Sequence, residues 1–153
     1  MNDKELKHRT NQIMFELMKT KGVIAPVDVL MGIGVLSKTD YEHWRRGGLD
    51  FLERACKINL RKLSAVNREI RAFANKNNLK ASWTYYKKWS SGKSKNKSAS
   101  PVKLRFSKSG DENIERSYAT HYISQQTLDE LKERRQQTER KNADTADTAE
   151  SSE

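Results

Sequence analysis

The sequence predicts a mainly α-helical fold, a small domain of five to seven helices with at most one short extended segment. Apolar residues recur at helical spacing along much of the chain, and capping residues or glycines mark the predicted helix ends. Only one stretch, near 102–106, alternates between apolar and basic residues as a strand does. Leu, Ile, Val and Phe make up 29 of the 153 residues, so the predicted core is small.

Helices are predicted throughout the first half of the chain. They span residues 4–20, 26–32, 37–46, 49–56 and 60–77. Gly22 is a typical C-cap for the first, and Pro26 suits the first turn of the second. Ser37 and Asn59 are expected N-caps. The last of these helices is the longest, and its apolar face consists of Leu60, Leu63, Val66, Ile70, Phe73 and Ala74.

The second half of the chain is predicted to be less regular. The expected segments are a basic helix over 83–89, a flexible basic linker over 90–100, an extended segment over 102–106, a helix from 109 to about 122, an exposed polar helix over 124–141 and a disordered acidic tail over 142–153. Ser82 would cap the first of these helices, and Ser109 with Glu112 would cap the second. We therefore expect a compact helical domain over 1–89, with 101–123 packing back onto it.

Positive charge is concentrated in the middle of the chain. The whole sequence carries 30 Lys and Arg against 20 Asp and Glu, for a net charge of +10. Residues 54–108 hold sixteen of the basic residues and a single acid, Glu69, whereas the segments on either side are neutral or acidic. A block of this composition repels itself unless a polyanion binds it, so it indicates contact with nucleic acid.

Basic side chains form a stripe on the predicted 60–77 helix, well separated from its apolar face. This ridge, together with the basic helix, the linker and the helix that follows Ser37, supplies the expected phosphate contacts. The predicted nucleic-acid-binding residues are Lys38, Arg45, Arg46, Lys57, Arg61, Arg68, Arg71, Lys87, Lys88, Lys93, Lys95 and Lys97.

Residues 27–37, which read VDVLMGIGVLS, resemble the helix-turn-helix of bacterial DNA-binding regulators. The resemblance covers residues 26–47 and implies a bracing helix, a turn at Gly34 and a second helix that enters the major groove. Two positions depart from the pattern: Leu30 stands where the family prefers Ala, and Leu36 lengthens the turn by one residue. Any reading of DNA sequence would then come from the helix that carries Lys38, Arg45 and Arg46.

Aromatic and cationic residues interleave between positions 80 and 89. This set consists of Lys80, Trp83, Tyr85, Tyr86, Lys87, Lys88 and Trp89. Aromatic rings can stack on unpaired bases while cations hold phosphates. In a chain short of aliphatic residues, however, aromatic side chains also fill the core, and we expect Trp83 to be buried.

The sequence contains no catalytic motif, and we predict neither an enzyme nor a cofactor. One cysteine excludes an internal disulfide, and the three histidines lack metal-ligand spacing, so no metal site is predicted. His121 and Cys56 are interpreted as packing residues. No apolar run is long enough for a membrane span and the N-terminus lacks the core of a secretion signal, so we expect a cytoplasmic protein without membrane contact.

The leading hypothesis is a non-enzymatic nucleic-acid-binding protein, with DNA and RNA left open. The alternative is an interaction adaptor that docks an acidic protein partner in an apolar groove beside Tyr41 and Trp44.

Overall fold

The computed structural model describes residues 1–89 and 102–150. In this part of the chain it has six α-helices, which confirms the mainly α-helical prediction, and a small three-stranded sheet, whereas at most one short extended segment near 102–106 was predicted. In chain order the elements are α1 (Asp3–Thr20), β1 (Val23–Ile24), α2 (Pro26–Gly32), α3 (Lys38–Arg45), the 3-10 helix η1 (Leu52–Ala55), α4 (Leu60–Lys76), β2 (Lys80–Trp83), α5 (Glu112–Ala119), β3 (Thr120–Ile123) and α6 (Gln125–Glu150).

Side-chain caps begin several of these helices. Ser37 accepts a hydrogen bond from the backbone N–H of Asp40, and Asn59 accepts one from Lys62, as the sequence predicted for α3 and α4. The cap of α5 is Asp111 rather than the predicted Ser109, because the Asp111 carboxylate accepts two backbone N–H groups of the first turn.

The sheet contradicts two predicted helices. The strands pair antiparallel in the order β1-β3-β2, with Ser82 opposite His121 and Trp83 opposite Thr120. Residues 83–89 are therefore not helical, and α5 ends at Ala119 instead of continuing to Tyr122. The aromatic residues of these segments suit an extended, half-exposed backbone, and pairing with a distant strand overrides their helical spacing.

Trp44 of α3 lies at the centre of the core, fully buried. Its ring lies 5.0 Å from that of Phe106 and 5.8 Å from that of Tyr86, and Phe106 stacks on Tyr118 at 5.5 Å. The indole N–H of Trp44 donates to the carbonyl of Arg105 at 2.8 Å. The extended segment near 102–106 thus contributes two core residues, Phe106 and the buried Leu104.

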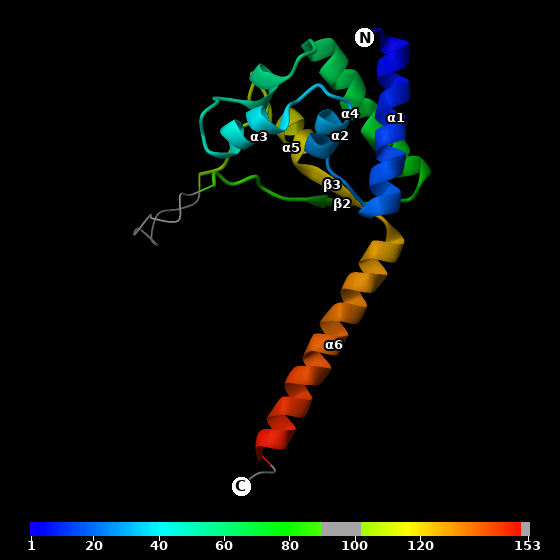
Figure 1. Ribbon diagram of the computed structural model, residues 1–153, viewed down its shortest axis with the longest axis vertical. Coiled ribbons are helices and arrows are strands. Elements are labelled where there is room, and N and C mark those ends of the chain that lie inside the picture. The colour runs from blue at the N-terminus through cyan, green and yellow to red at the C-terminus, as the bar shows by residue number, and fades with distance from the viewer. Residues whose placement is uncertain (90–101, 151–153) are drawn as a thin grey trace.

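The α6 helix projects from the body as a single long rod (Figure 1). It begins beside Gly22, where the hydroxyls of Ser124 and Thr127 meet at 2.8 Å. The sequence predicted that this helix would end at 141, whereas α6 ends at Glu150. Among the described residues, no helix combines the length and the apolar character that a bilayer-spanning segment needs.

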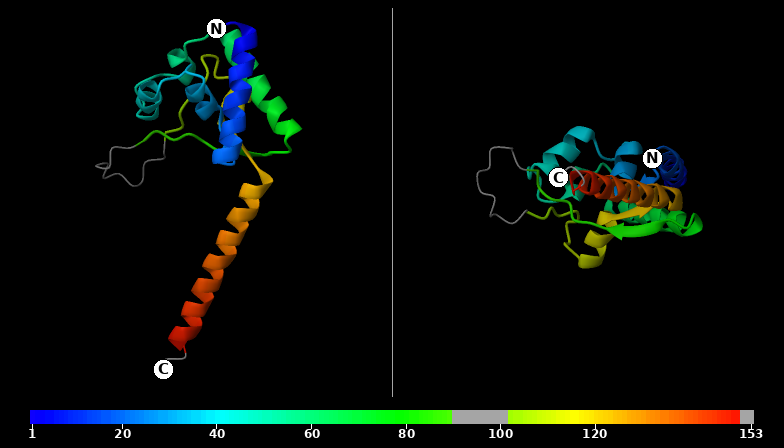
Figure 2. Two further views of the ribbon diagram at one scale, coloured as in Figure 1. Left: turned by 45° about the vertical axis from the view of Figure 1, so that its right-hand side comes forward. Right: turned by 90° about the horizontal axis from the view of Figure 1, so that it is seen from below.

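The two long helices α1 and α4 pack together on one flank of the body (Figure 1). In the view from below (Figure 2, right), β2 and α5 lie along one edge of the body and α2 and α3 along the opposite edge. The predicted linker, 90–100, lies outside the described residues, and so do Lys93, Lys95 and Lys97.

Candidate nucleic-acid interface

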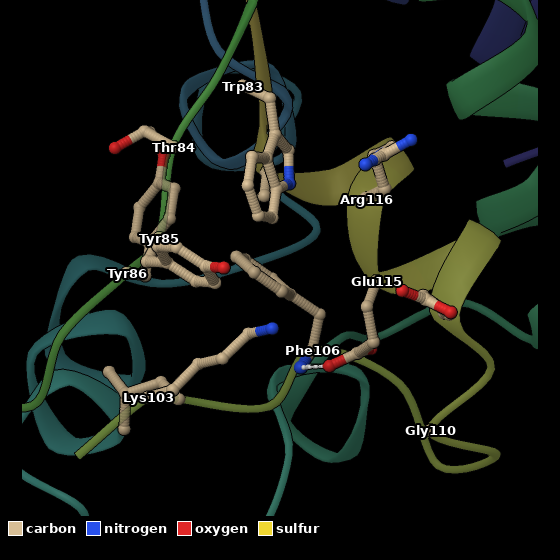
Figure 3. A pocket seen from close by; sticks show the side chains of 12 residues that line it. Trp83, Thr84, Tyr85, Tyr86, Lys103, Phe106, Gly110, Glu115 and Arg116 are labelled. Atoms are coloured by element: carbon tan, nitrogen blue, oxygen red, sulfur yellow. Dashed lines mark hydrogen bonds between the residues drawn. The ribbon is translucent and has the colours of Figure 1, made fainter.

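A pocket of about 280 Å³ opens between the end of β2 and the helix α5 (Figure 3). We name it the aromatic pocket. Its lining residues include two aromatic and four charged side chains: Trp83, Tyr85, Lys103, Glu112, Glu115 and Arg116. The two rings come from the strand side, and the carboxylates and the guanidinium come from α5.

The rings of the aromatic pocket are exposed, which corrects the prediction that Trp83 is a core residue. Trp83 is 42% exposed and Tyr85 is 49% exposed. Their ring centroids lie 4.4 Å apart with the planes tilted by 63°. The neighbouring Tyr86 is buried and contacts Trp44 in the core.

Two cations flank these rings. The Lys103 ammonium lies 4.5 Å from the centroid of Tyr85 and 5.9 Å from that of Trp83. The Arg116 guanidinium lies 5.2 Å from the Trp83 ring. These distances are typical of cation–π contacts, which hold the charges beside the ring faces and leave hydrogen-bond donors available for a ligand.

Extended backbone explains how the pocket forms. Trp83 and Tyr85 are two residues apart in an extended stretch, so their side chains share a face, while Tyr86 points into the core. Two backbone hydrogen bonds, from Lys88 to Val102 and from Leu104 to Tyr86, place Lys103 beside them.

Two carboxylates of α5, Glu112 and Glu115, line the aromatic pocket. The Glu115 carboxylate accepts hydrogen bonds from the backbone N–H groups of Phe106 and Ser107 and from the Ser107 hydroxyl, at 2.7–2.8 Å. These three neutral donors fix the position of the Glu115 carboxylate. Glu112 is exposed, and its charge opposes an anionic ligand at the helix start.

A second cavity, of about 440 Å³, lies on the other side of α5, between that helix and α4. We name it the arginine groove; its polar walls are formed by Ser64, Asn67, Arg68, Arg71, Asn113 and Ser117. The Arg71 guanidinium donates to the Ser117 hydroxyl at 2.8 Å.

The acidic residue Glu53 lines the arginine groove and accepts hydrogen bonds from within the protein. The Glu53 carboxylate accepts the Tyr118 hydroxyl at 2.7 Å and the Lys108 backbone N–H at 2.9 Å. Burial and this carboxylate raise the pKa of Tyr118, which stays protonated and donates. The formal charges of Arg68, Arg71 and Glu53 leave the groove with one net positive charge.

The predicted contact residues lie in several places. Lys38 and Arg46 are exposed on or next to α3, and Lys57, Lys87 and Lys88 are also exposed. Arg68 and Arg71 meet in the arginine groove. The structure does not bring all of these cations onto one ridge.

Two of the predicted contact residues are engaged within the protein. Arg61 pairs with Asp3 of α1 at 3.0 Å, and this contact lowers the pKa of the Asp3 carboxyl. Arg45 is half-buried, with its guanidinium 5.0 Å from the Tyr86 ring and 5.1 Å from the Trp89 ring. The buried Nε of Arg45 has no hydrogen-bond partner among the described residues.

Sequence reasoning missed Lys103 and Arg116 as members of the interface. The alternation over 102–106 contained a usable signal for Lys103, because the apolar residue Leu104 turns inward and its neighbour must turn outward. Arg116 carried no such signal, since its contact with Trp83 depends on the pairing of β2 with β3, which follows α5 directly.

The remaining reactive side chains have structural roles. Burial and the neighbouring acidic residues Glu53 and Asp40 raise the pKa of Cys56 to about 12, so the thiol is not activated. His121 Nε2 lies 2.8 Å from the Tyr86 hydroxyl, and burial lowers the pKa of His121. Within the described residues, no group of His, Cys, Asp and Glu has a metal-binding arrangement.

Comparisons with protein-family models, with curated proteins and with solved structures find no match to this chain.

Proposed function

We propose that this is a cytoplasmic, non-enzymatic nucleic-acid-binding protein. The observation that carries the proposal is the exposed pair Trp83 and Tyr85, flanked by Lys103 and Arg116 in one pocket. Large exposed rings cost free energy in water, and a base face covers them while the cations meet the adjoining phosphates.

The charge distribution supports the same function. Residues 54–108 carry sixteen basic side chains and one acid, and Glu69, that single acid, lies 3.7 Å from Lys7 of α1. The net charge of +10 favours encounter with a polyanion over a wide range of approach directions. Exposed Lys57, Lys87 and Lys88 provide phosphate contacts outside the two cavities.

The resemblance of 26–47 to a helix-turn-helix supports a narrower role as a DNA-binding regulator. Gly34 has φ of 81°, a left-handed value that suits the turn between α2 and α3. In this role Lys38 and Arg46 would approach the major groove, whereas Arg45 is held between aromatic rings. The aromatic pocket favours the general function over this narrower role.

A salt titration tests the function. A labelled duplex and a labelled single strand are titrated with the full-length protein at several salt concentrations, and the affinity is measured by fluorescence anisotropy. If about six phosphates are neutralised, the logarithm of the affinity falls with that of the salt concentration with a slope of about −5 for the duplex and about −4 for the single strand. Absence of binding to either probe at low salt would contradict the function.

A further inference from the structure

One line of contacts runs through the aromatic pocket to Arg116 of α5, and a separate hydrogen bond joins the adjacent Ser117 to the arginine groove. Lys103 lies over Tyr85, the Tyr85 ring contacts Trp83, and Arg116 lies over Trp83, at 4.5, 4.4 and 5.2 Å. The next residue, Ser117, accepts a hydrogen bond from Arg71 at 2.8 Å.

The helix α5 forms the partition between the two cavities. Arg116 lines the aromatic pocket, whereas its neighbour Ser117 lines the arginine groove. An α-helix with its side chains is about 10–12 Å across, so one short stretch of polymer can occupy both sides of it. Aromatic surface is then available on one side, and two guanidinium groups on the other.

We propose that the ligand is a single unpaired nucleic-acid strand that crosses α5, with bases stacked on Trp83 and Tyr85 and phosphates held by Arg71 and Arg68. This inference rests on the proposed function and specifies its ligand. Arg116 and Lys103 bind the phosphates next to the stacked bases, and the strand reaches the arginine groove over Ser117.

Stacking on the rings favours an unpaired strand over a duplex. Trp83 is 42% exposed, and Lys103 and Arg116 lie beside its ring. Base faces in a duplex are covered by their neighbours, so a base stacks on a protein ring only after it leaves the helix. A single strand offers its base faces without that cost.

The charges along this path also fit a phosphate backbone. The two cavities are lined by four cations, Lys103, Arg116, Arg71 and Arg68, against three carboxylates, Glu112, Glu115 and Glu53. Glu115 and Glu53 accept internal hydrogen bonds, and the exposed Glu112 lies at the start of α5, away from Ser117. The expected crossing point is therefore the second half of the helix.

Matched variants separate stacking from phosphate contact. The probes are a labelled single strand of about 12 nucleotides, in DNA and in RNA, and the DNA duplex of the same sequence. We expect either single strand to bind the full-length protein more tightly than the duplex. Trp83→Ala weakens single-strand binding by about 5-fold to 100-fold without changing the salt slope, and Trp83→Phe, which keeps a ring, retains most of the affinity.

Substitutions in the arginine groove are expected to change the salt dependence of binding, unlike the substitution of Trp83. The double variant Arg68→Ala with Arg71→Ala makes the salt slope for the single strand shallower by about 1.4, as expected for two lost phosphate contacts. The matched control for charge is Arg134→Ala with Arg135→Ala on the exposed part of α6, which leaves the affinity close to that of the wild type. The matched control for an exposed ring is Phe15→Ala on α1, where Lys19 lies 4.9 Å from the ring.

The outcomes distinguish this inference from the proposed function. Equal affinity for strand and duplex, or wild-type affinity of Trp83→Ala, overturns the single-strand assignment and leaves nucleic-acid binding intact. An unchanged salt slope in the arginine variant overturns the path across α5. Absence of binding to every probe at low salt overturns both the path and the function.

Discussion

The carboxylate of Glu115 shows how one side chain shapes the aromatic pocket. It accepts three hydrogen bonds from Phe106 and Ser107, and Ser107 is almost fully buried. These bonds fix the chain beside α5, and Phe106 in turn packs against Trp44 and Tyr118. The position of the wall opposite Trp83 therefore depends on a residue that lies mostly beneath the surface.

Glu115→Ala is expected to lower the free energy of unfolding by about 2–4 kcal/mol, because buried donors lose their acceptor. The measurement is equilibrium denaturation in urea. Glu112→Ala on the same helix is the control and should cost at most about 0.5 kcal/mol, since only its favourable place at the helix start is lost. Equal effects of the two substitutions would contradict the role assigned to Glu115.

The contact between Tyr86 and His121 predicts a pH dependence of stability. Burial lowers the pKa of His121 below its ordinary value of 6.5, so the unfolded chain binds more protons than the folded protein when the pH falls below that value. Stability from this group is therefore complete above pH 6.5 and is lost as the pH falls toward the folded-state pKa.

His121→Gln removes this titration and keeps a group that can meet the Tyr86 hydroxyl. We expect the wild type to lose more unfolding free energy than the variant between about pH 7 and about pH 5. Denaturation curves at both pH values measure the difference. Parallel losses in the two proteins would show that His121 is not a source of the dependence.

At the scale of elements, α3 distinguishes the two proposed modes of nucleic-acid binding, which are groove reading by a helix and base stacking in the aromatic pocket. Its Trp44 anchors the core and its Arg45 packs between rings, so Lys38 and the adjoining Arg46 remain as its outward cations. Groove reading by a helix needs several side chains on base edges, and two cations mainly contact phosphates.

Lys38→Ala combined with Arg46→Ala is therefore expected to change single-strand affinity by less than about 3-fold, the size of a weak, screened surface contribution. The same anisotropy titration measures it, with the Arg68 and Arg71 double variant as the comparison of equal charge. A larger loss for duplex than for single strand would favour the helix-turn-helix role instead.

The success of sequence prediction also differed from element to element. The spacing in α1 and α4 and the caps of α3 and α4 act within three or four residues, so local sequence determines them. The strand β2 has no such local determinant: four consecutive residues are exposed, and its partner β3 lies far away in the chain. The helix predicted over 83–89, with Ser82 as its cap, is absent because Ser82 and Trp83 pair with β3.

At the scale of the whole molecule, α6 adds length without adding to the core. Its described residues beyond Leu128 are exposed, whereas Thr127 and Leu128 are partly covered near Gly22. Exposed helices gain little stability from packing, and their removal leaves the remaining contacts in place.

Truncation after Leu128 is expected to shift the melting temperature by no more than about 3 °C, because no core residue is removed. Thermal unfolding followed by near-ultraviolet circular dichroism, which reports on the packed aromatic core, measures it. Thr127→Ala within the full chain provides the comparison for the contact at Gly22. A collapse of the near-ultraviolet signal on truncation would show that α6 supports the body.

The sequence alone determined the helical class, the caps of α3 and α4 and the location of the charge, because these depend on composition and on neighbours within one or two turns. Tertiary structure decided which aromatic residues are buried: Trp44 and Tyr86 occupy the core, so Trp83 and Tyr85 remain at the surface. It also brought Lys103 and Arg116 to those rings, since antiparallel pairing and the packing of α5 join segments that no local pattern connects.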